Sequence, residues 1–270
     1  MLGSLADADD VVQETWLRWQ SLDEDRRKEI ERPAAWLTTA ATRIALDRLK
    51  SAQRRREEYV GPWLPEPVLT DDDPADAAVL SESLTLGFLT VLERLGPVER
   101  AVFLLADVFD EPFAAIADTV GRSEEACRQI ASRARRRVRD ERKRFEPSDS
   151  DALVRAFVEA CLIGTLDEFR KVLSDDVVLV SDGGADVHAA RRPVVGVERV
   201  ARLLGNLVKR MPTDVDIEFH QVNHESGLLV RRGGLPWYVL ALEQRDGRAA
   251  AVRLVLNPEK LHHLDEVVVL

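Results

Sequence analysis

The chain has 270 residues, a formal net charge of −10 and 45% hydrophobic residues, so it is long enough for two or three small domains with buried cores. No apolar run approaches the ~18 residues of a transmembrane helix, and the acidic N-terminal segment has neither the basic leader nor the apolar stretch of a secretory signal. Two cysteines, Cys127 and Cys161, exclude a disulfide framework and a structural zinc site. We therefore expect a cytoplasmic protein without a membrane contact, a metal or a cofactor.

Charge is distributed unevenly along the chain. Residues 43–56 carry six basic side chains and one acidic side chain, and residues 122–145 carry ten basic and four acidic ones. By contrast, residues 57–82 carry eight acidic side chains and no basic one. Two basic stretches in an acidic chain favour a polyanionic partner that contacts the protein at two places.

Residues 5–59 are predicted to be helical. Leu5, Val11, Val12, Trp16 and Leu17 recur at helical spacings. A second helix is expected to begin at Pro33, because proline is favoured in the first turn. Its apolar face comprises Trp36, Leu37, Ala40, Ile44 and Leu49.

Residues 61–76, with the sequence GPWLPEPVLTDDDPAD, predict an extended linker. Four prolines and five acidic residues disfavour any regular element there. Trp63 and Leu64 are unusual in a passive linker. They either pack on the nearest domain or dock the linker at a specific place.

Residues 77–146 are predicted to be helical again and to contain a helix-turn-helix. Phe113, Ile116, Ala117 and Val120 form one apolar face, and Gly121 ends that helix. Ser123 is a good N-cap for the next helix. The outward face of the second helix is expected to carry Arg128, Gln129, Ser132, Arg133 and Arg136. Arginine and glutamine can read base edges in a major groove, whereas a solvated basic helix face is the alternative.

Residues 149–270 have a different pattern and predict an α+β domain. Two helices over 151–173, a strand at 177–182 and a long helix at 196–211 precede four strands at 215–222, 227–232, 235–245 and 248–257. The four strands are separated by Gly, Asn and Asp turns, so we expect them to be antiparallel. Asp182, His188, His220 and His224 are acid–base candidates by residue type only, since their spacing defines neither a triad nor a metal set.

Several segments together resemble the bacterial extracytoplasmic-function (group IV) sigma factors of RNA polymerase. DADDVVQETWLRW (7–19) is similar to their polymerase-binding helix, and PAAWLTTAATRIALDRLKSAQRRREEY (33–59) is similar to their promoter-melting and minus-ten segment. RLGPVERAVFLLADVFDEPFAAIADTVGRSEEACRQIASRARRRVR (94–139) resembles region four, which reads the minus-thirty-five element. GPWLPEP in the linker and NPEKL (257–261) are similar to signatures of the subgroup with a fused C-terminal SnoaL-like domain.

The resemblance implies four parts. They are an N-terminally truncated region two at 1–60, a linker at 61–76, a region four at 77–146 and a SnoaL-like regulatory domain with a cone-shaped fold at 149–270. It departs from the subgroup pattern at Ala185 and Asp186, where the usual glycine-rich motif ends in a lysine.

The resemblance also implies roles for individual residues. Core polymerase would be bound by Asp9, Asp10, Gln13, Glu14 and Leu17. Promoter DNA would be contacted on the minus-ten side by Arg43, Asp47, Arg48, Arg54 and Arg55, and upstream by Arg128, Gln129, Ser132, Arg133 and Arg136. Contact between the linker and the C-terminal domain would involve Trp63, Leu64, Pro65, Glu66, Pro67, Asp182, Gly183, Gly184, Asn257, Pro258, Lys260 and Leu261.

We therefore expect a promoter-specificity subunit of RNA polymerase that is not an enzyme and is modulated by its own C-terminal domain. Two other functions stay open. One is a helix-turn-helix regulator whose C-terminal domain senses a small molecule. The other is a SnoaL-type enzyme with a DNA-binding appendage, whose turnover would depend on Asp182 or His188.

Overall fold

The computed structural model describes residues 1–57, 59, 61–70, 85–142 and 151–265. It divides into two compact units, one formed by residues 1–58 and 91–140 and the other by residues 59–90 and 141–270. The units are described in turn. No helix in the described ranges is long and apolar enough to cross a membrane.

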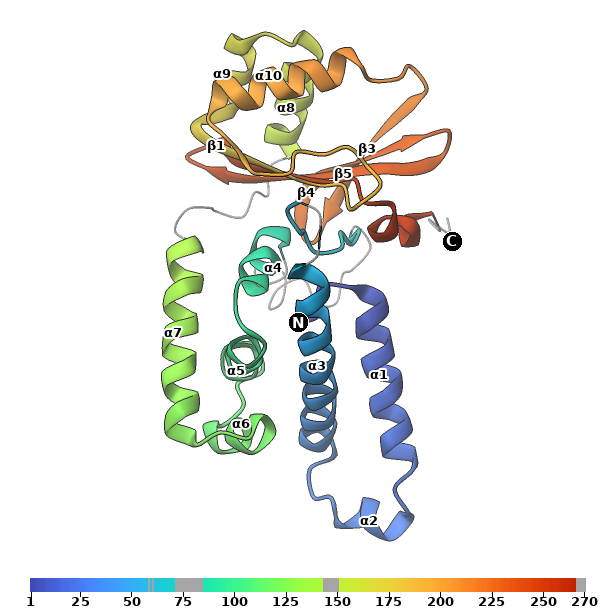
Figure 1. The fold of residues 1–270 in the computed structure, drawn as a ribbon, viewed down its shortest axis with the longest axis vertical. Coiled ribbons are helices and arrows are strands. Elements are labelled where there is room, and N and C mark those ends of the chain that lie inside the picture. The colour runs from blue at the N-terminus through green and yellow to red at the C-terminus, as the bar shows by residue number, and fades with distance from the viewer. Residues whose placement is uncertain (58, 60, 71–84, 143–150, 266–270) are drawn as a thin grey trace. The chain divides into compact units, whose positions relative to one another are not determined.

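The first unit begins with the helices α1 (Leu5–Gln20), α2 (Glu24–Glu29) and α3 (Pro33–Glu57). α3 starts at Pro33, as its sequence predicted. α1 lies alongside α3 (Figure 1), and the core between them contains Val11, Ile44 and Leu49. Of the apolar residues that mark α1 as a helix, Val11 is the one that is buried.

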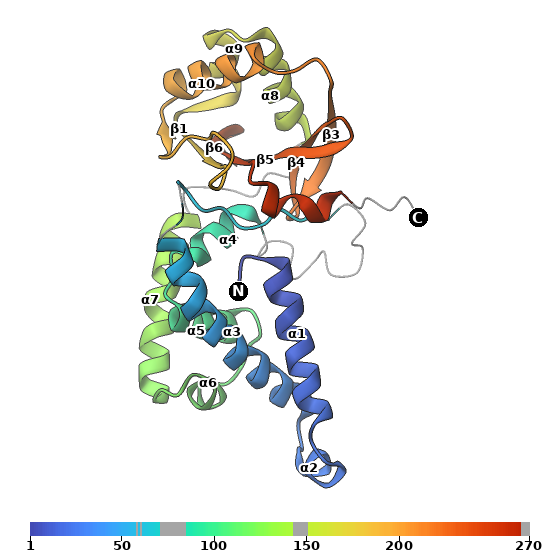
Figure 2. The same cartoon turned by 45° about the vertical axis from the view of Figure 1, so that its right-hand side comes forward.

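The second half of this unit contains the predicted helix-turn-helix. α5 (Pro97–Asp107) precedes α6 (Phe113–Val120), and a short turn joins α6 to α7 (Glu124–Arg142), as Figure 2 shows. Gly121 has a φ of 67° and ends α6, while the Ser123 hydroxyl accepts a hydrogen bond from the Ala126 amide at 3.2 Å. Ile116, Ala117, Cys127 and Ala131 are buried between the helices, so the predicted apolar faces meet as expected.

Helix α4 (Leu86–Glu93) spans the boundary between the units, because residues up to Thr90 belong to the second one. In the second unit, α8 (Asp151–Ile163), α9 (Leu166–Val172) and α10 (Val197–Lys209) accompany a six-stranded sheet. The strand order is β2-β1-β6-β5-β4-β3. The strand bounds are β1 (Leu173–Asp182), β2 (Val194–Val195), β3 (Val215–Val222), β4 (Glu225–Arg232), β5 (Leu235–Arg245) and β6 (Arg248–Val255).

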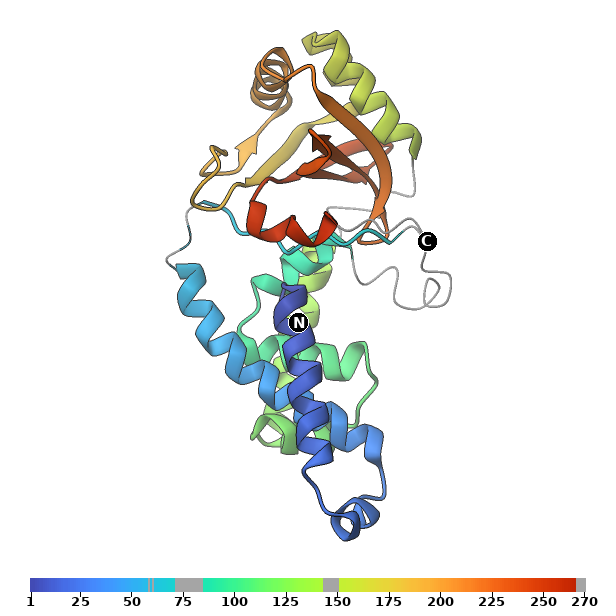
Figure 3. The same ribbon diagram turned by 90° about the vertical axis from the view of Figure 1, so that its right-hand side faces the viewer.

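The predicted α+β fold class is confirmed, and the sheet is mixed. β3 to β6 pair antiparallel in chain order, as their turns predicted. β1 instead pairs parallel with β6, and the long stretch of chain between them provides the crossover that parallel neighbours need. In Figure 3 the sheet is curved, with α8 and α10 on one side and two 3-10 turns, η2 (Pro258–Lys260) and η3 (His262–Leu264), on the other.

Both faces of this sheet are covered by apolar side chains. The face under α8 and α10 packs around Phe157, Leu204 and Leu240. The opposite face packs Val239 and Val255 against Leu64 of the linker and Leu86 of α4. Because side chains alternate along a strand, neighbouring residues of β4, β5 and β6 belong to different cores.

Candidate linker-docking site and nucleic-acid interface

The linker meets the C-terminal domain at a buried ion pair. The Lys260 ammonium lies 2.7 Å from the Asp182 Oδ2, and both side chains are almost inaccessible to solvent. Asp182 ends β1 and Lys260 lies in η2, so 78 residues separate the partners in sequence. A buried pair of this kind is favourable only when further hydrogen bonds satisfy both groups.

The main chain of Leu64 supplies those further bonds. Its amide donates to Asp182 Oδ2 at 2.7 Å, and its carbonyl accepts from the Lys260 ammonium. The Leu64 side chain is fully buried in the adjoining apolar core. The ion pair therefore binds both backbone polar groups of one linker residue.

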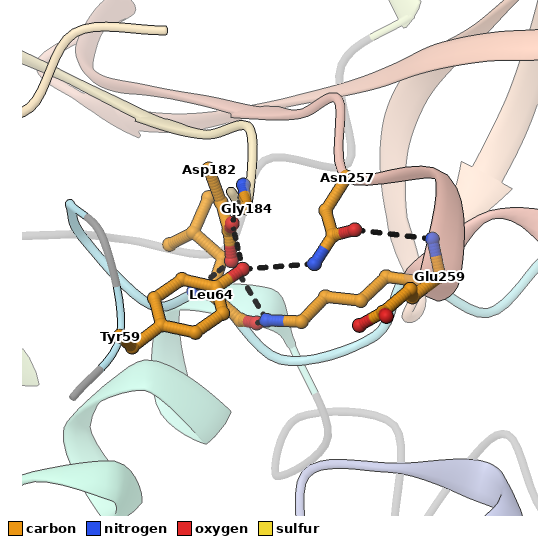
Figure 4. Close-up of polar contacts among 7 residues, drawn as sticks. Tyr59, Leu64, Asp182, Gly184, Asn257 and Glu259 are labelled. Atoms are coloured by element: carbon orange, nitrogen blue, oxygen red, sulfur yellow. Dashed lines mark hydrogen bonds and ion pairs between the residues drawn. The ribbon is translucent and has the colours of Figure 1, made fainter. Parts of the chain in front are cut away.

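Aromatic side chains cover this contact. The Tyr59 hydroxyl donates to Asp182 Oδ1 and accepts from the Asn257 amide at 2.8 Å, as drawn in Figure 4. Burial and the hydrogen bond to Asp182 raise the pKa of Tyr59 above its ordinary value, so it stays protonated. The Lys260 ammonium lies 3.2 Å from the centroid of the Trp63 ring, which is a cation–π contact.

The glycine loop after β1 has no room for larger residues. The Gly184 amide donates to Asp182 Oδ1 at 3.1 Å, and a β-carbon on Gly184 would lie 2.9 Å from Cγ of Asn257. Gly184 also has a φ of 63°, which favours glycine. Ala185 and Asp186, which follow, are exposed. The lysine that contacts Asp182 in this chain is thus Lys260 of NPEKL.

Beyond Leu64 the linker continues as an extended segment against the end of β3. The Thr70 amide donates to the Gln221 carbonyl and the Asn223 amide donates to the Val68 carbonyl, both at 2.8 Å. A His263 ring nitrogen lies 2.8 Å from the Pro67 carbonyl oxygen. Of the residues predicted to dock the linker, Leu64, Pro65, Pro67, Asp182, Gly183, Gly184, Asn257, Lys260 and Leu261 are buried, Trp63 and Glu66 are half-buried, and Pro258 is exposed.

A second buried polar cluster lies in the same unit and was not predicted. Glu225 of β4 and Glu243 of β5 are both about 2% exposed, and Arg253 of β6 donates to Oε1 of Glu243 at 2.6 to 2.7 Å. The Leu86 amide of α4 is hydrogen-bonded to Glu225. The one available signal was the spacing along β5. Glu243 lies an even number of residues after Val239, so both side chains point to the same face of the sheet, and Val239 faces the core.

Within this cluster Arg253 pairs with Glu243, whereas it acts on Glu225 only through its charge. The pKa of Glu225 is raised to about 8, first by burial and then by the nearby Glu243 carboxylate, while Arg253 opposes the shift. One oxygen of each carboxyl group has no hydrogen-bond partner within the described ranges. Glu225 is therefore neutral at pH 7, which reduces the cost of burying both groups.

In the first unit, the outward face of α7 carries the residues predicted to read DNA. Arg128, Gln129, Ser132, Arg133 and Arg136 are all exposed. Arg128 is paired with Glu124 one helical turn earlier, at 2.6 Å, and lies over the Phe113 ring. This face of α7 is thus a basic, solvent-accessible surface.

Arg43, predicted for the minus-ten side, is engaged by the helix-turn-helix. Its guanidinium donates to the Asp118 carbonyl at 2.8 Å and to the Thr119 carbonyl at 3.3 Å. These carbonyls belong to the last turn of α6, where the helix dipole attracts a cation. The Thr39 and Thr119 hydroxyls lie 3.3 Å apart and extend the contact.

Arg48 joins two predicted surfaces. It lies 2.8 Å from Asp10 and 3.7 Å from Glu14, both predicted to bind polymerase. Asp47 is exposed and pairs with Lys50 at 2.8 Å. Arg54 and Arg55 belong to α3, but their side chains lie outside the described part of the structure.

The outer face of α1 combines acidic and apolar side chains. Asp9, Asp10 and Gln13 are exposed, and Leu17 is 57% exposed. Val12 and Trp16, which were not predicted as site residues, are 67% and 54% exposed. Exposed large apolar residues beside carboxylates are typical of a protein-binding surface.

The acid–base candidates of the C-terminal domain do not converge. Asp182 is occupied by the linker, His188 is exposed, and His220 lies 3.1 Å from Glu218. His224 has a φ of 61° in the β3–β4 turn. Among the described residues, no group of three or more His, Cys, Asp or Glu side chains is arranged to hold a metal ion.

Comparisons with known proteins identify the family of the chain. The family model described as Sigma-70 region 2 matches residues 1–55, and that described as Sigma-70, region 4 matches residues 86–138. The ECF RNA polymerase sigma factor SigJ of Mycobacterium tuberculosis is 38% identical over 278 residues, which cover 96% of this chain and 87% of that relative. The probable ECF sigma factor SigI of the same organism is 37% identical over 205 residues, covering 74% and 68%.

A solved structure matches along almost the whole chain. The crystal structure of M. tuberculosis SigJ has a TM-score of 0.74 at 35% identity, covering 96% of this chain and 91% of that one. The sequence resemblance is therefore confirmed over the helical regions and the C-terminal domain together. The chain belongs to the extracytoplasmic function (ECF) sigma factors of RNA polymerase, with an α+β C-terminal domain in the same polypeptide.

Proposed function

We propose that this sigma factor directs core RNA polymerase to specific promoters and that its own C-terminal domain modulates this activity through the linker. The working parts are region two at 1–60, the linker at 61–76, region four at 77–146 and the regulatory domain at 149–270. The observation that carries the proposal is the buried Asp182–Lys260 pair, which binds both backbone polar groups of Leu64.

The geometry of this contact suits a switch. Apolar side chains alone would let the linker shift along the domain, whereas two buried charges bound to the amide and carbonyl of one residue specify a single register. The linker connects the two promoter-reading regions, so holding it restricts how those regions span a promoter. A bias of a few kcal/mol between held and released linker is enough to shift the active population.

The family and the exposed surfaces support an assignment of the promoter and polymerase contacts. We assign upstream DNA to the α7 face with Arg128 and Arg133, the minus-ten element to Arg43, Asp47, Arg48, Arg54 and Arg55, and core polymerase to the α1 face. In the structure Arg43 is bound to the carbonyl end of α6. DNA binding by Arg43 therefore requires that this contact open.

Reconstituted transcription tests the proposal. Purified core polymerase is combined with the full chain or with a chain that lacks residues 149–270, on a promoter selected from random DNA. We expect promoter-specific transcripts whose yield differs several-fold between the two chains. Equal yields would contradict modulation by the C-terminal domain, and a full chain that neither co-elutes with polymerase nor supports transcription would favour a polymerase-independent regulator.

A further inference from the structure

The C-terminal domain contains an apolar cavity of about 120 Å³ between α8, α10 and the sheet. Phe157 of α8 and Leu204 of α10 form its helical wall, and Leu240 and Leu254 form its sheet wall. In Figure 3 this is the side of the sheet opposite the 3-10 turns that contact the linker. An engineered apolar cavity of about 150 Å³ stays dry and binds benzene, so a cavity of comparable size suits a small apolar ligand.

The lining determines which ligands fit. None of the described lining residues is charged. The Tyr238 hydroxyl and the Cys161 thiol are polar groups of the wall, and burial raises the pKa of each to about 12, so both are neutral at pH 7. A charged ligand would lose its hydration without gaining a counter-ion.

The cavity opens to solvent at an apolar mouth. Leu162 near the end of α8, Leu207 near the end of α10 and Ile217 of β3 line it, and they are 70%, 45% and 37% exposed. An apolar molecule can therefore enter and extend beyond the enclosed volume. Exposed large apolar residues that rim a concave apolar wall are a recurrent feature of ligand sites.

We propose that this cavity binds an uncharged, largely hydrocarbon small molecule the size of one aromatic ring or a chain of about six to eight carbons. A single hydroxyl or carbonyl on the ligand would find the Tyr238 hydroxyl as its hydrogen-bond partner. The acid–base candidates Asp182, His188, His220 and His224 are not among the residues that line the cavity. The proposed binding site is accordingly separate from these four residues.

Occupancy would also act on the linker, and this second step rests on the function proposed above. Three pairs of adjacent strand residues connect the two sides of the sheet. In each pair the first residue lines the cavity and the second packs in the apolar core around Leu64, which we call the linker core: Leu228 and Leu229, Leu240 and Val239, Leu254 and Val255. Leu64 packs in that linker core. If a ligand displaces the strands from the cavity side, the displacement thus reaches the linker side across the thickness of a single sheet.

Binding is tested by calorimetry on the full chain with 1-octanol, and with octanoate and octylamine as charged analogues of equal length. We expect saturable binding of 1-octanol and at least tenfold weaker binding of both charged analogues. Cys161→Phe and Val158→Phe fill the cavity and should each reduce affinity at least tenfold. Ile163→Phe adds the same ring to an adjacent, 59% exposed residue outside the lining and should bind 1-octanol like the native chain.

Two results would overturn the site: equal affinity for the charged analogues, or native binding by both filled variants when circular dichroism shows them folded. The coupling step has its own readout. Transcription should change several-fold with saturating 1-octanol for the native chain and not for Cys161→Phe. Binding without a change in transcription would reject the coupling alone, whereas equal transcription with and without residues 149–270 would reject the proposed function and leave the site intact.

Discussion

Gly87 and Glu243 lie so close together that a β-carbon on residue 87 would come within 1.8 Å of Glu243 Oε1. Gly87 belongs to the first turn of α4, and Glu243 is held in place by Arg253. The first turn of α4 therefore packs directly against a buried carboxyl group of the C-terminal domain. Only glycine allows the backbone of α4 to approach this closely.

Gly87→Ala is expected to destabilise the packing of α4 on the sheet by about 1–3 kcal/mol, because Glu243 cannot move without losing Arg253. Thermal or urea unfolding of the full chain measures this loss. Gly205→Ala in α10 is the matched control, since the nearest atom to its added β-carbon is 3.8 Å away. The control should be neutral or stabilising, because alanine is the better helix former.

The stability of the second unit should fall as pH rises, because of Glu225. Its pKa is about 8 in the folded chain and near its ordinary value of 4.5 when unfolded. Below pH 4.5 both states are protonated, and the stabilisation is fully present. Between pH 4.5 and 8 only the unfolded state releases the proton, so the free energy of unfolding decreases by up to several kcal/mol.

Urea unfolding between pH 5 and 9 measures this dependence. Glu225→Gln keeps the shape of the protonated side chain and should flatten the profile, making the variant more stable than the native chain at pH 8. Glu259→Gln removes an exposed carboxylate and serves as the control. If Glu225→Gln left the profile unchanged, this carboxyl group would not be the source of the pH dependence of the free energy of unfolding.

Lys260→Met should destabilise the linker contact by about 3–5 kcal/mol, because it leaves the Asp182 carboxylate buried without a counter-ion. Adding Asp182→Asn to Lys260→Met should recover part of the loss, since the unpaired charge is removed as well. A double-mutant cycle on unfolding free energies measures the coupling. Additive losses would contradict a direct interaction between the two side chains.

Replacing Arg128 and Arg133 by alanine should weaken promoter binding at least tenfold at low salt. Each lost phosphate contact also reduces the slope of log affinity against log salt by about 1. Fluorescence anisotropy with promoter DNA, titrated over a range of salt concentrations, measures both quantities. Arg170→Ala in α9, which removes one exposed arginine from the C-terminal domain, should change neither.

Much of the local structure could be predicted because its signals are local. Pro33 begins α3, Gly121 ends α6 and Ser123 caps α7, and each acts through its own backbone conformation or its immediate neighbours. The strands at 215–222 and 235–245 have the predicted bounds. Parallel pairing of β1 with β6 was not predicted, because it depends on where the chain returns after more than 60 residues.

The docking site could be predicted only in part. We expected three motifs to contact one another, namely those that contain Trp63 and Leu64, Asp182, and Lys260. This expectation came from the resemblance to a family and not from the residues themselves. The hydrogen bonds of the Leu64 main chain to Asp182 and Lys260 could be found only in the tertiary structure. Glu225 was missed because a lone glutamate at the start of a strand looks like an exposed turn residue.

By itself, the sequence determined most helices and strands, their apolar faces and the two basic segments, since periodicity, caps and charge are properties of neighbouring residues. It missed β2 and the first residues of β1 and β4. Tertiary structure alone decided that Arg43 binds the end of α6, that Glu225 is buried near the Glu243–Arg253 pair, and that the two faces of one sheet hold a cavity and the linker. These relationships join residues far apart in the chain, and only the folded path of the backbone brings such residues within bonding distance.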